Sequence, residues 1–253
     1  MSVVERVAGP AAEDAERPWV IASNNAHKLS EIRAILERFG VSAQSPAELG
    51  AALDVDEWGA TFACNAALKA LAWARHVGRV ALADDSGLAV DALGGAPGVH
   101  SARYGGVGAS DADNNAKLIA ELAALEASGG AVDRRCCYHA VIVVACRSDE
   151  APGWWLAGAR PAATVEELGA DDAVVLPWEG DLWALRSFSG QWCGEVGRVA
   201  RGEGGFGYDP WFRLADGRHV AELGAAEKNA VSHRGLALAR LASWLERGEH
   251  VTG

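Results

Sequence analysis

Two adjacent carboxylates, Asp84 and Asp85, directly follow a short apolar run at residues 80–83. The apolar run predicts a buried strand, and the Ser-Gly pair after the carboxylates predicts a turn. Two negative charges at the end of a buried strand are costly unless a cation or hydrogen-bond donors meet them. Ligands of open α/β sheets bind at this same end of the strands. The segment therefore indicates a metal-assisted active site, with a solvated turn as the alternative.

A second polar cluster lies between a predicted strand and a predicted helix, at residues 23–28. Backbone amides at the start of a helix, with a hydroxyl, two amide side chains and an ammonium group, can bind an anion. The segment is not a P-loop, because the Gly-x-x-x-x-Gly-Lys pattern is absent. Ordinary capping of the helix is the alternative. The candidate anion-binding residues are Ser23, Asn24, Asn25, Ala26, His27 and Lys28.

A third candidate group contains Asp56 and Glu57, whose carboxylates could be metal ligands. Asn65 and Lys69 follow at a spacing that places them on one face of a helix. The alternative is a capped surface helix with Lys69 in water.

A fourth group combines a glycine-rich loop, two aromatic rings and a carboxylate at residues 204–210. A ring beside a carboxylate suits a heterocycle with N–H donors, because the ring stacks and the carboxylate accepts hydrogen bonds. The alternative is a plain glycine loop at residues 204–210, with an ordinary amphipathic helix after it. The candidate residues are Phe206, Gly207, Tyr208, Asp209, Lys228, His233 and Arg234, and Ser86 is a further candidate beside the paired carboxylates.

The elements that would position these groups alternate between strands and helices, which favours an α/β fold. Apolar and β-branched runs predict strands, and apolar residues at helical spacing predict helices. The segment at residues 148–186 contains four tryptophans; we expect it to extend the sheet as a hairpin, with a dimer surface as the alternative. Predicted strands are 19–22, 80–83, 138–146, 153–157, 173–176 and 192–199; predicted helices are 29–39, 62–76, 113–125 and 227–246.

Composition narrows the classes of protein that fit. The chain has 253 residues, half of them hydrophobic, and a net charge of -11. No basic face suggests a nucleic-acid partner, and no stretch is long and apolar enough for a membrane span. The five cysteines are an odd number without a Cys-x-x-Cys pair, which favours reduced thiols in the cytoplasm over a disulfide framework or structural zinc.

Taken together, these motifs resemble the inosine triphosphate pyrophosphatase family. The matching segments occur in the family's order over residues 19–245: they are 22–28, 61–70, 83–104, 205–210 and 227–235. The resemblance implies an elongated, two-lobed α/β protein with a mixed β-sheet flanked by helices. It implies a loose tail at residues 1–17, then a single catalytic domain at 18–247 with the active site between the lobes. It also implies a cytoplasmic homodimer that uses Mg²⁺.

The implied reaction converts a purine nucleoside triphosphate and water into the monophosphate and pyrophosphate. The implied substrates are ITP, dITP and XTP, so the role is to clear deaminated purines from the nucleotide pool. By resemblance, Asp85 is the general base and a metal-linked carboxylate, and we expect a nearby metal to keep its pKa low. Glu57, with Asp56 as its neighbour, falls at the other acidic metal position. The 23–28 segment, Lys69 and Ser86 fall at triphosphate contacts, and the 206–209 segment, Lys228, His233 and Arg234 at base and nucleotide contacts.

The chain departs from the family pattern at two places. Cys64 stands where the family commonly has an acidic residue, and the segment at residues 148–186 is longer than the usual connection. Two other functions remain open: a catalytically silent nucleotide-sensing protein, and a pyrophosphatase for another modified nucleotide. The presence of Asp85 and Lys28 argues against the silent protein.

Overall fold

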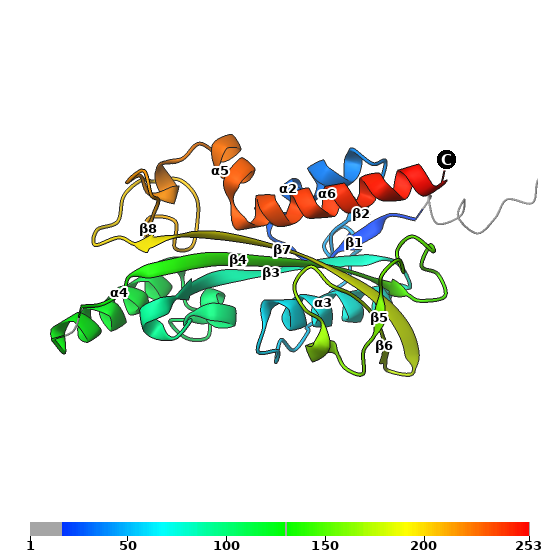
Figure 1. Ribbon diagram of the computed structural model, residues 1–253, viewed down its shortest axis with the longest axis horizontal. Coiled ribbons are helices and arrows are strands. Elements are labelled where there is room, and N and C mark those ends of the chain that lie inside the picture. Colours follow the sequence, from blue (N-terminus) through cyan, green and yellow to red (C-terminus); the bar gives the residue numbers. More distant parts are fainter. Residues whose placement is uncertain (1–16, 130, 253) are drawn as a thin grey trace, which may run out of the picture.

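The computed structural model describes residues 17–129 and 131–252, and the predicted α/β fold is confirmed (Figure 1). Within these residues, one mixed sheet runs through the molecule in the order β2-β1-β3-β4-β7-β6-β5, and β8 pairs with β7. Its strands are β1 (Trp19–Ile21), β2 (Ala43–Gln44), β3 (Ala81–Val90), β4 (Arg135–Arg147), β5 (Arg160–Pro161), β6 (Ala173–Trp178), β7 (Asp181–Val196) and β8 (Phe212–Arg213).

Helices cover both faces of this sheet (Figure 1). The α-helices are α2 (Ala26–Glu37), α3 (Phe62–Val77), α4 (Asp111–Ala127), α5 (Ala225–Val231) and α6 (His233–Thr252). Short 3₁₀ helices are η1 (Asp91–Leu93), η2 (Gly98–Arg103), η3 (Val165–Glu167) and η4 (Val220–Glu222). Residues 1–16, which include nearly all of the predicted tail, lie outside the described residues. Among the described residues, none of the helices has the length and apolar character that a membrane crossing requires.

The central strands β3, β4 and β7 are long and antiparallel, and the stretch of β4 from Ala140 to Cys146 is buried on both faces. Alternate residues of β4 enter two different cores. Val141 and Val143 pack with α3, whereas Ile142 and Val144 pack with α2 and α6. A strand covered on both faces reads as a continuous apolar run, which is why the sequence predicted it correctly.

Helix α3 shows why its predicted limits agree with the structure. The Thr61 side chain caps it by accepting a hydrogen bond from the Cys64 amide, and Gly78 ends it with φ 62°. Left-handed backbone at the end of a helix favours glycine. Alanines such as Ala66 and Ala70 are fully buried, so the helix lies close to the sheet and Lys69 is carried with it.

The strand that carries the paired carboxylates is longer than predicted. We expected it to end at residue 83, but β3 continues to Val90 and pairs with β4 throughout. The Ser-Gly turn signal is overridden because each residue from Asp84 to Val90 has a partner on β4. Gly87 is needed in this strand because a Cβ there would overlap the Ser101 side chain.

The prediction of one long helix at residues 227–246 is also wrong, because the helix is interrupted at Ser232, between α5 and α6. Two glycines permit the close packing around this break. A Cβ at Gly235 would overlap the Asn229 carbonyl oxygen, and a Cβ at Gly190 of β7 would overlap the carbonyl oxygen of His233. The first turn of α6 therefore lies directly on the sheet.

The segment at residues 148–186 forms the predicted hairpin from β6 and β7. Its two-residue turn, Glu179 and Gly180, has φ of 46° and 93°, as expected for the turn that matches strand twist. The strand predicted at residues 153–157 is wrong, since this stretch forms turns. Trp155 there is buried and packs on Trp244 of α6.

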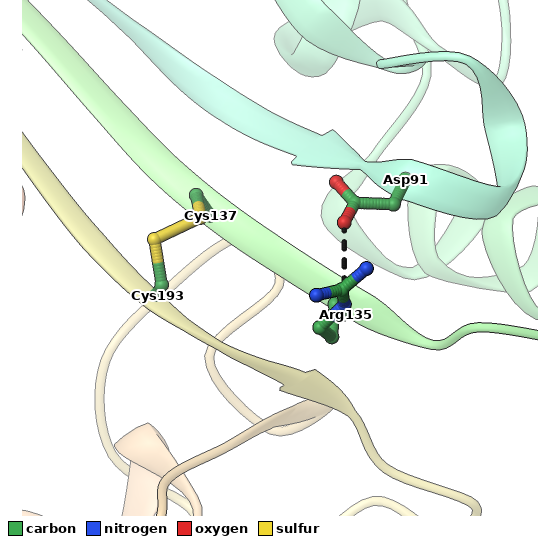
Figure 2. Close-up of a disulfide and its surroundings, with 4 residues drawn as sticks. All are labelled: Asp91, Arg135, Cys137 and Cys193. Carbon is green, nitrogen blue, oxygen red and sulfur yellow. Dashed lines mark ion pairs between the residues drawn. A yellow bond between two sulfur atoms is a disulfide. The ribbon is translucent and has the colours of Figure 1, made fainter.

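The prediction of reduced thiols fails for one pair, because Cys137 and Cys193 form a disulfide between β4 and β7 (Figure 2). The two residues are directly opposite each other in the sheet register. Their separation of 56 residues along the chain gave no sign of this pairing. The other three cysteines, Cys64, Cys136 and Cys146, are buried thiols.

Candidate active site

The two adjacent carboxylates point to opposite faces of the sheet, because successive residues of a strand alternate. Asp84 lies opposite Ile142, on the face covered by α2 and α6, and Asp85 lies opposite Val141, on the face covered by α3. They therefore belong to two separate charged clusters. The prediction that both carboxylates sit together at the end of a strand is therefore wrong: they lie within β3 and on its opposite faces.

Asp84 is buried between two cations. The Lys28 ammonium forms an ion pair with it, and the Arg234 Nε lies 3.5 Å from the same carboxylate oxygen. Burial alone would raise the pKa of Asp84, but the positive charges of Lys28 and Arg234 outweigh it and hold the pKa well below its usual range. Asp84 is therefore a fixed anion that positions these two cations.

Lys28 reaches Asp84 from the first turn of α2. The Asn25 side chain caps this helix by accepting hydrogen bonds from the amides of His27 and Lys28, at 3.0 and 3.2 Å. Lys28 Nζ also lies 3.4 Å from the hydroxyl of Ser86. Helix capping and cation placement are thus combined in one segment, rather than being alternatives.

Asp85 belongs to the second cluster, with Lys69 and Glu57. Lys69 Nζ lies 3.2 Å from the Asp85 carboxylate and 3.2 Å from the Glu57 carboxylate. Burial raises the pKa of Asp85; Lys69 opposes this rise, and the negative charge of Glu57 adds to it. The second carboxylate oxygen of Asp85, Oδ2, is buried and has no hydrogen-bond partner. It is therefore available to accept a proton or to bind a cation.

The edge of β3 connects the two clusters. Strand β1 pairs with β3 at Ala81 and Leu82. Ser86, further along β3, donates to Asp84 at 3.4 Å and lines a cavity of about 340 Å³. Ser86 therefore places this cavity one residue along β3 from Asp85.

The cavity has an aromatic and charged wall built on Asp209. The Asp209 carboxylate accepts hydrogen bonds from the Phe206 amide at 2.9 Å, from Lys228 Nζ at 2.6 Å and from the Tyr138 hydroxyl at 3.2 Å. The same Lys228 Nζ lies 4.4 Å from the centre of the Phe206 ring. This arrangement offers a flat apolar surface beside hydrogen-bonding groups, which suits a heterocyclic base.

His233 completes the wall at the start of α6. Its ring stacks on Tyr138 with centroids 4.7 Å apart, and its Nδ1 is buried without a partner. Burial, aided by the positive charge of Arg234, lowers the pKa of His233 to about 3. The ring is therefore neutral near pH 7, with one nitrogen that donates and one that accepts.

Arg234 is held mainly by other protein groups. It contacts the Glu31 carboxylate at 3.2 Å and the Ser86 hydroxyl at 3.2 Å. Opposing charges on Asp84 and Glu31 outweigh its burial and raise the pKa of Arg234. Its place beside Ser86 puts it nearer the strand edge than the aromatic wall, so His233 is the better candidate for contact with a base.

Most of the predicted binding residues meet at this cavity. Four do not line it: Asn24 and Ala26 are exposed, His27 stacks on Phe206 with centroids 6.0 Å apart, and Lys69 belongs to the Asp85 cluster. Those that line it are Ser23, Asn25, Lys28, Ser86, Phe206, Gly207, Tyr208, Asp209, Lys228, His233 and Arg234. A larger cavity of about 750 Å³ lies between β7 and α6 and contains none of these residues.

Several residues of the site were not predicted from the sequence: Gly87, Ser101, Ala102, Asp111 and Tyr138, which line the cavity, and Glu31, which pairs with Arg234. Tyr138 gave no signal, because it begins an apolar strand and its hydroxyl partner is 71 residues away. Glu31 follows Lys28 at helical spacing, so its place on the same face of α2 could have been recognised.

The residues present fit a magnesium ion. Asp85 and Glu57 provide carboxylates, and Asp85 Oδ2 lacks a partner. Asp56 is exposed and stands outside this cluster. Within residues 17–129 and 131–252 no group of three or more His, Cys, Asp or Glu gathers as a metal site. Mg²⁺ commonly needs one or two carboxylates together with substrate phosphates, so two are sufficient.

Cys64 supplies no charge to this cluster. Burial, with a smaller effect from the negative charge of Glu166, raises the pKa of the Cys64 thiol to about 11. The thiol is therefore neutral near pH 7 and adds no negative charge beside Asp85 and Glu57.

A mixed α/β sheet with a buried carboxylate–lysine cluster next to an aromatic cavity defines a nucleotide-handling hydrolase. The chain belongs to the Ham1 family, whose model matches residues 19–167 and 173–244.

Known relatives are similar over nearly the whole chain. A dITP/XTP pyrophosphatase of Geobacillus kaustophilus is 41% identical over 92% of this chain and 95% of its own length. The dITP/XTP pyrophosphatase of Ralstonia nicotianae is 42% identical over 92% of this chain and 99% of its own. A solved HAM1 protein from Coxiella burnetii superposes with a TM-score of 0.71 at 35% identity, covering 91% of this chain and 98% of that one.

Proposed function

We propose that this protein hydrolyses the triphosphates of deaminated purines, ITP, dITP and XTP, to the monophosphate and pyrophosphate. The observation that carries the proposal is the edge of β3, where Ser86 lines the aromatic cavity next to Asp85 on the strand. A nucleotide with its base in the cavity would extend its phosphates toward Asp85. The names of the Geobacillus and Ralstonia relatives support the same reaction. The reaction would clear deaminated purines from the nucleotide pool.

Cations at the strand edge would bind the triphosphate. Lys28, at the start of α2, and Lys69, on α3, approach β3 from opposite faces. A triphosphate brings about four negative charges, and the first turn of a helix adds a favourable dipole. The existing ion pairs with Asp84 and Asp85 keep both ammonium groups in position before the substrate arrives.

Asp85 would act as the general base, through its unpartnered Oδ2, on the attacking water. Burial raises the pKa of Asp85, and bound Mg²⁺ would lower it again, so Asp85 would act mostly by positioning the water. Asp85 and Glu57 would hold Mg²⁺, which supplies charge neutralisation at the phosphoryl group when bound. Lys69 links these two carboxylates and keeps them on the same side of the strand.

Selection among purines would depend on the polar groups of the cavity wall. Hypoxanthine and xanthine carry a carbonyl at C6 and an N1–H, whereas adenine carries an amino donor and a bare N1. Lys228 and His233 can donate to the carbonyl, and Asp209 can accept the N–H. Adenine would leave these groups unpaired, and such a mismatch can discriminate by about 10⁴.

We further propose that the protein is a cytoplasmic homodimer and that residues 18–247 form one catalytic domain with the site between two lobes. The resemblance to the family supports both statements. The mass of the purified protein in solution tests the first, and a monomer at assay concentration would contradict it.

A substrate panel tests the proposed reaction. Pyrophosphate release with Mg²⁺ is measured for ITP, dITP, XTP, GTP and ATP, and the values of kcat/KM are compared. We expect the first three to be favoured over ATP by about 10⁴. Comparable rates for ATP would contradict the proposal, as would turnover of a modified pyrimidine triphosphate, included in the same panel, without turnover of ITP, dITP or XTP. Nucleotide binding without turnover would favour a sensing protein.

A further inference from the structure

The Cys137–Cys193 disulfide lies on the face of the sheet opposite the aromatic cavity. It joins directly opposed residues of β4 and β7, with their Cα atoms 4.0 Å apart (Figure 2). Cys193 is exposed and Cys137 is half-buried. Arg135 of β4 and Asp91 form an exposed ion pair nearby, so this part of the surface is open to solvent (Figure 2). Small thiols and disulfides in solution can therefore reach the bond.

The residues that follow and precede these cysteines reach the other face. Tyr138 and Trp192 are also directly opposed in the register. Phe212 stacks on Tyr138 with centroids 4.9 Å apart and lies 5.6 Å from Trp192. Tyr138 in turn donates to Asp209. A single backbone step thus separates the disulfide from the wall of the base cavity.

The remaining thiols differ sharply from this pair. Cys64 and Cys136 are buried, and burial raises the pKa of Cys64 to about 11 and that of Cys136 to about 12. Cys146 is buried as well. Thiol exchange requires an accessible thiolate, so these three do not compete with the exposed pair.

We propose that Cys137 and Cys193 form a reversible thiol–disulfide couple that adjusts nucleotide binding at the base cavity. The oxidant is a low-molecular-weight disulfide. The Cys193 thiolate attacks one sulfur of that disulfide and releases one thiolate. The Cys137 thiolate then attacks the Cys193 sulfur and releases the second. The two protein thiols lose two protons and two electrons, and the small disulfide takes them up as two thiols.

The consequence for binding follows from the geometry. In the bonded form, β4 and β7 cannot separate at the pair next to Tyr138 and Trp192. In the reduced form these side chains gain freedom that must be lost when a base binds. Ordering a few side chains corresponds to a change in affinity of about threefold to tenfold. Asp85 lies opposite Val141, further along β4, so the chemical step is not affected.

Alkylation tests the couple without any assumption about activity. The protein is treated with iodoacetamide after oxidation by glutathione disulfide or after reduction, and peptides are weighed. We expect label on Cys137 and Cys193 after reduction and on neither after oxidation. Label on both after oxidation, or on neither after reduction, overturns the couple.

The effect on the site rests on the proposed function and needs two readouts. For ITP, KM should be about threefold to tenfold lower in the oxidised form, with kcat unchanged. Tryptophan fluorescence titration with ITP gives the dissociation constant without turnover, so loss of hydrolysis does not obscure the result. Cys193→Ser should show the reduced value under both conditions, whereas the matched control Cys146→Ala should keep the response. Equal affinity in both forms, or a response that persists in Cys193→Ser, overturns the proposal.

Discussion

The buried, neutral state of His233 predicts how the stability of the protein depends on pH. The pKa of His233 is lowered to about 3 in the folded protein, while an unfolded histidine has a pKa of about 6.5. The unfolded chain therefore binds a proton that the folded chain excludes. Stability from this residue is complete above pH 6.5 and is lost as the pH falls from there toward 3.

The magnitude follows from the linkage relation. Each pH unit below the unfolded pKa costs about 1.4 kcal/mol, so lowering the pH from 7.5 to 5 removes about 2 kcal/mol through this residue. Burial opposes protonation most strongly, followed by the positive charge of Arg234. Asp84 favours protonation, by less than Arg234 opposes it, and Lys228 and Lys28 add smaller opposing effects.

Urea unfolding at pH 7.5 and at pH 5 measures this loss, and His233→Gln is the matched variant because glutamine does not titrate. Other groups affect both proteins alike, so the quantity of interest is the difference between their losses. We expect wild type to lose about 2 kcal/mol more than the variant. Equal losses would show that His233 takes up a proton in the folded state, and the account of a neutral ring in the cavity would be refuted.

Three further predictions concern the base cavity, the sheet and the disulfide. Phe206→Leu removes the stacking surface, so KM for ITP should rise about tenfold, whereas Phe206→Trp keeps a ring and should change KM little. Steady-state kinetics measures both variants, and an equal rise of KM in the two would argue against stacking. Gly190→Ala places a Cβ against the His233 carbonyl, so the unfolding temperature should fall by several degrees relative to Gly153→Ala, where no atom is close and the backbone is not left-handed; calorimetry showing a smaller loss for Gly190→Ala would contradict the packing. Reducing Cys137–Cys193 reopens a loop of 56 residues and should lower the free energy of unfolding by about 4 kcal/mol. Urea unfolding with and without reductant measures this loss, and no change would show that the disulfide does not restrict the unfolded chain.

The sequence predicted the elements that depend on local pattern. Helix α3 has both a capping threonine and a terminal glycine, and β4 is apolar because both of its faces are covered. Most of the residues that line the cavity were also singled out, since each predicted cluster follows or precedes a recognisable apolar run, and their roles stay predictions. These signals lie within a few residues of one another, so no knowledge of the tertiary fold was required.

Features that depend on distant contacts were not predicted. The turn signal at Ser86 and Gly87 was misleading because β4, distant in sequence, continues to pair with β3. The opposite orientation of Asp84 and Asp85 follows only once that strand is continuous. The partnership of Cys137 and Cys193 likewise depends on strand register, which sequence spacing does not reveal.

The break between α5 and α6 has a similar origin. A helical pattern continues through residues 227–246, but the first turn of α6 must fit against Gly190 of β7. Tyr138 was missed because an aromatic residue in an apolar strand resembles any core residue, and only its contact with Asp209 distinguishes it.

The role of Asp85 is the central claim, and pyrophosphate release from ITP by Asp85→Asn tests it most directly. The variant keeps the shape of the side chain but removes its ability to accept a proton. Asp54→Asn, an exposed carboxylate on the loop before α3, is the matched control. We expect kcat to fall by about 10³ in Asp85→Asn while ITP still binds, and the control to be unchanged. Turnover by Asp85→Asn within a few fold of wild type would contradict this role of Asp85.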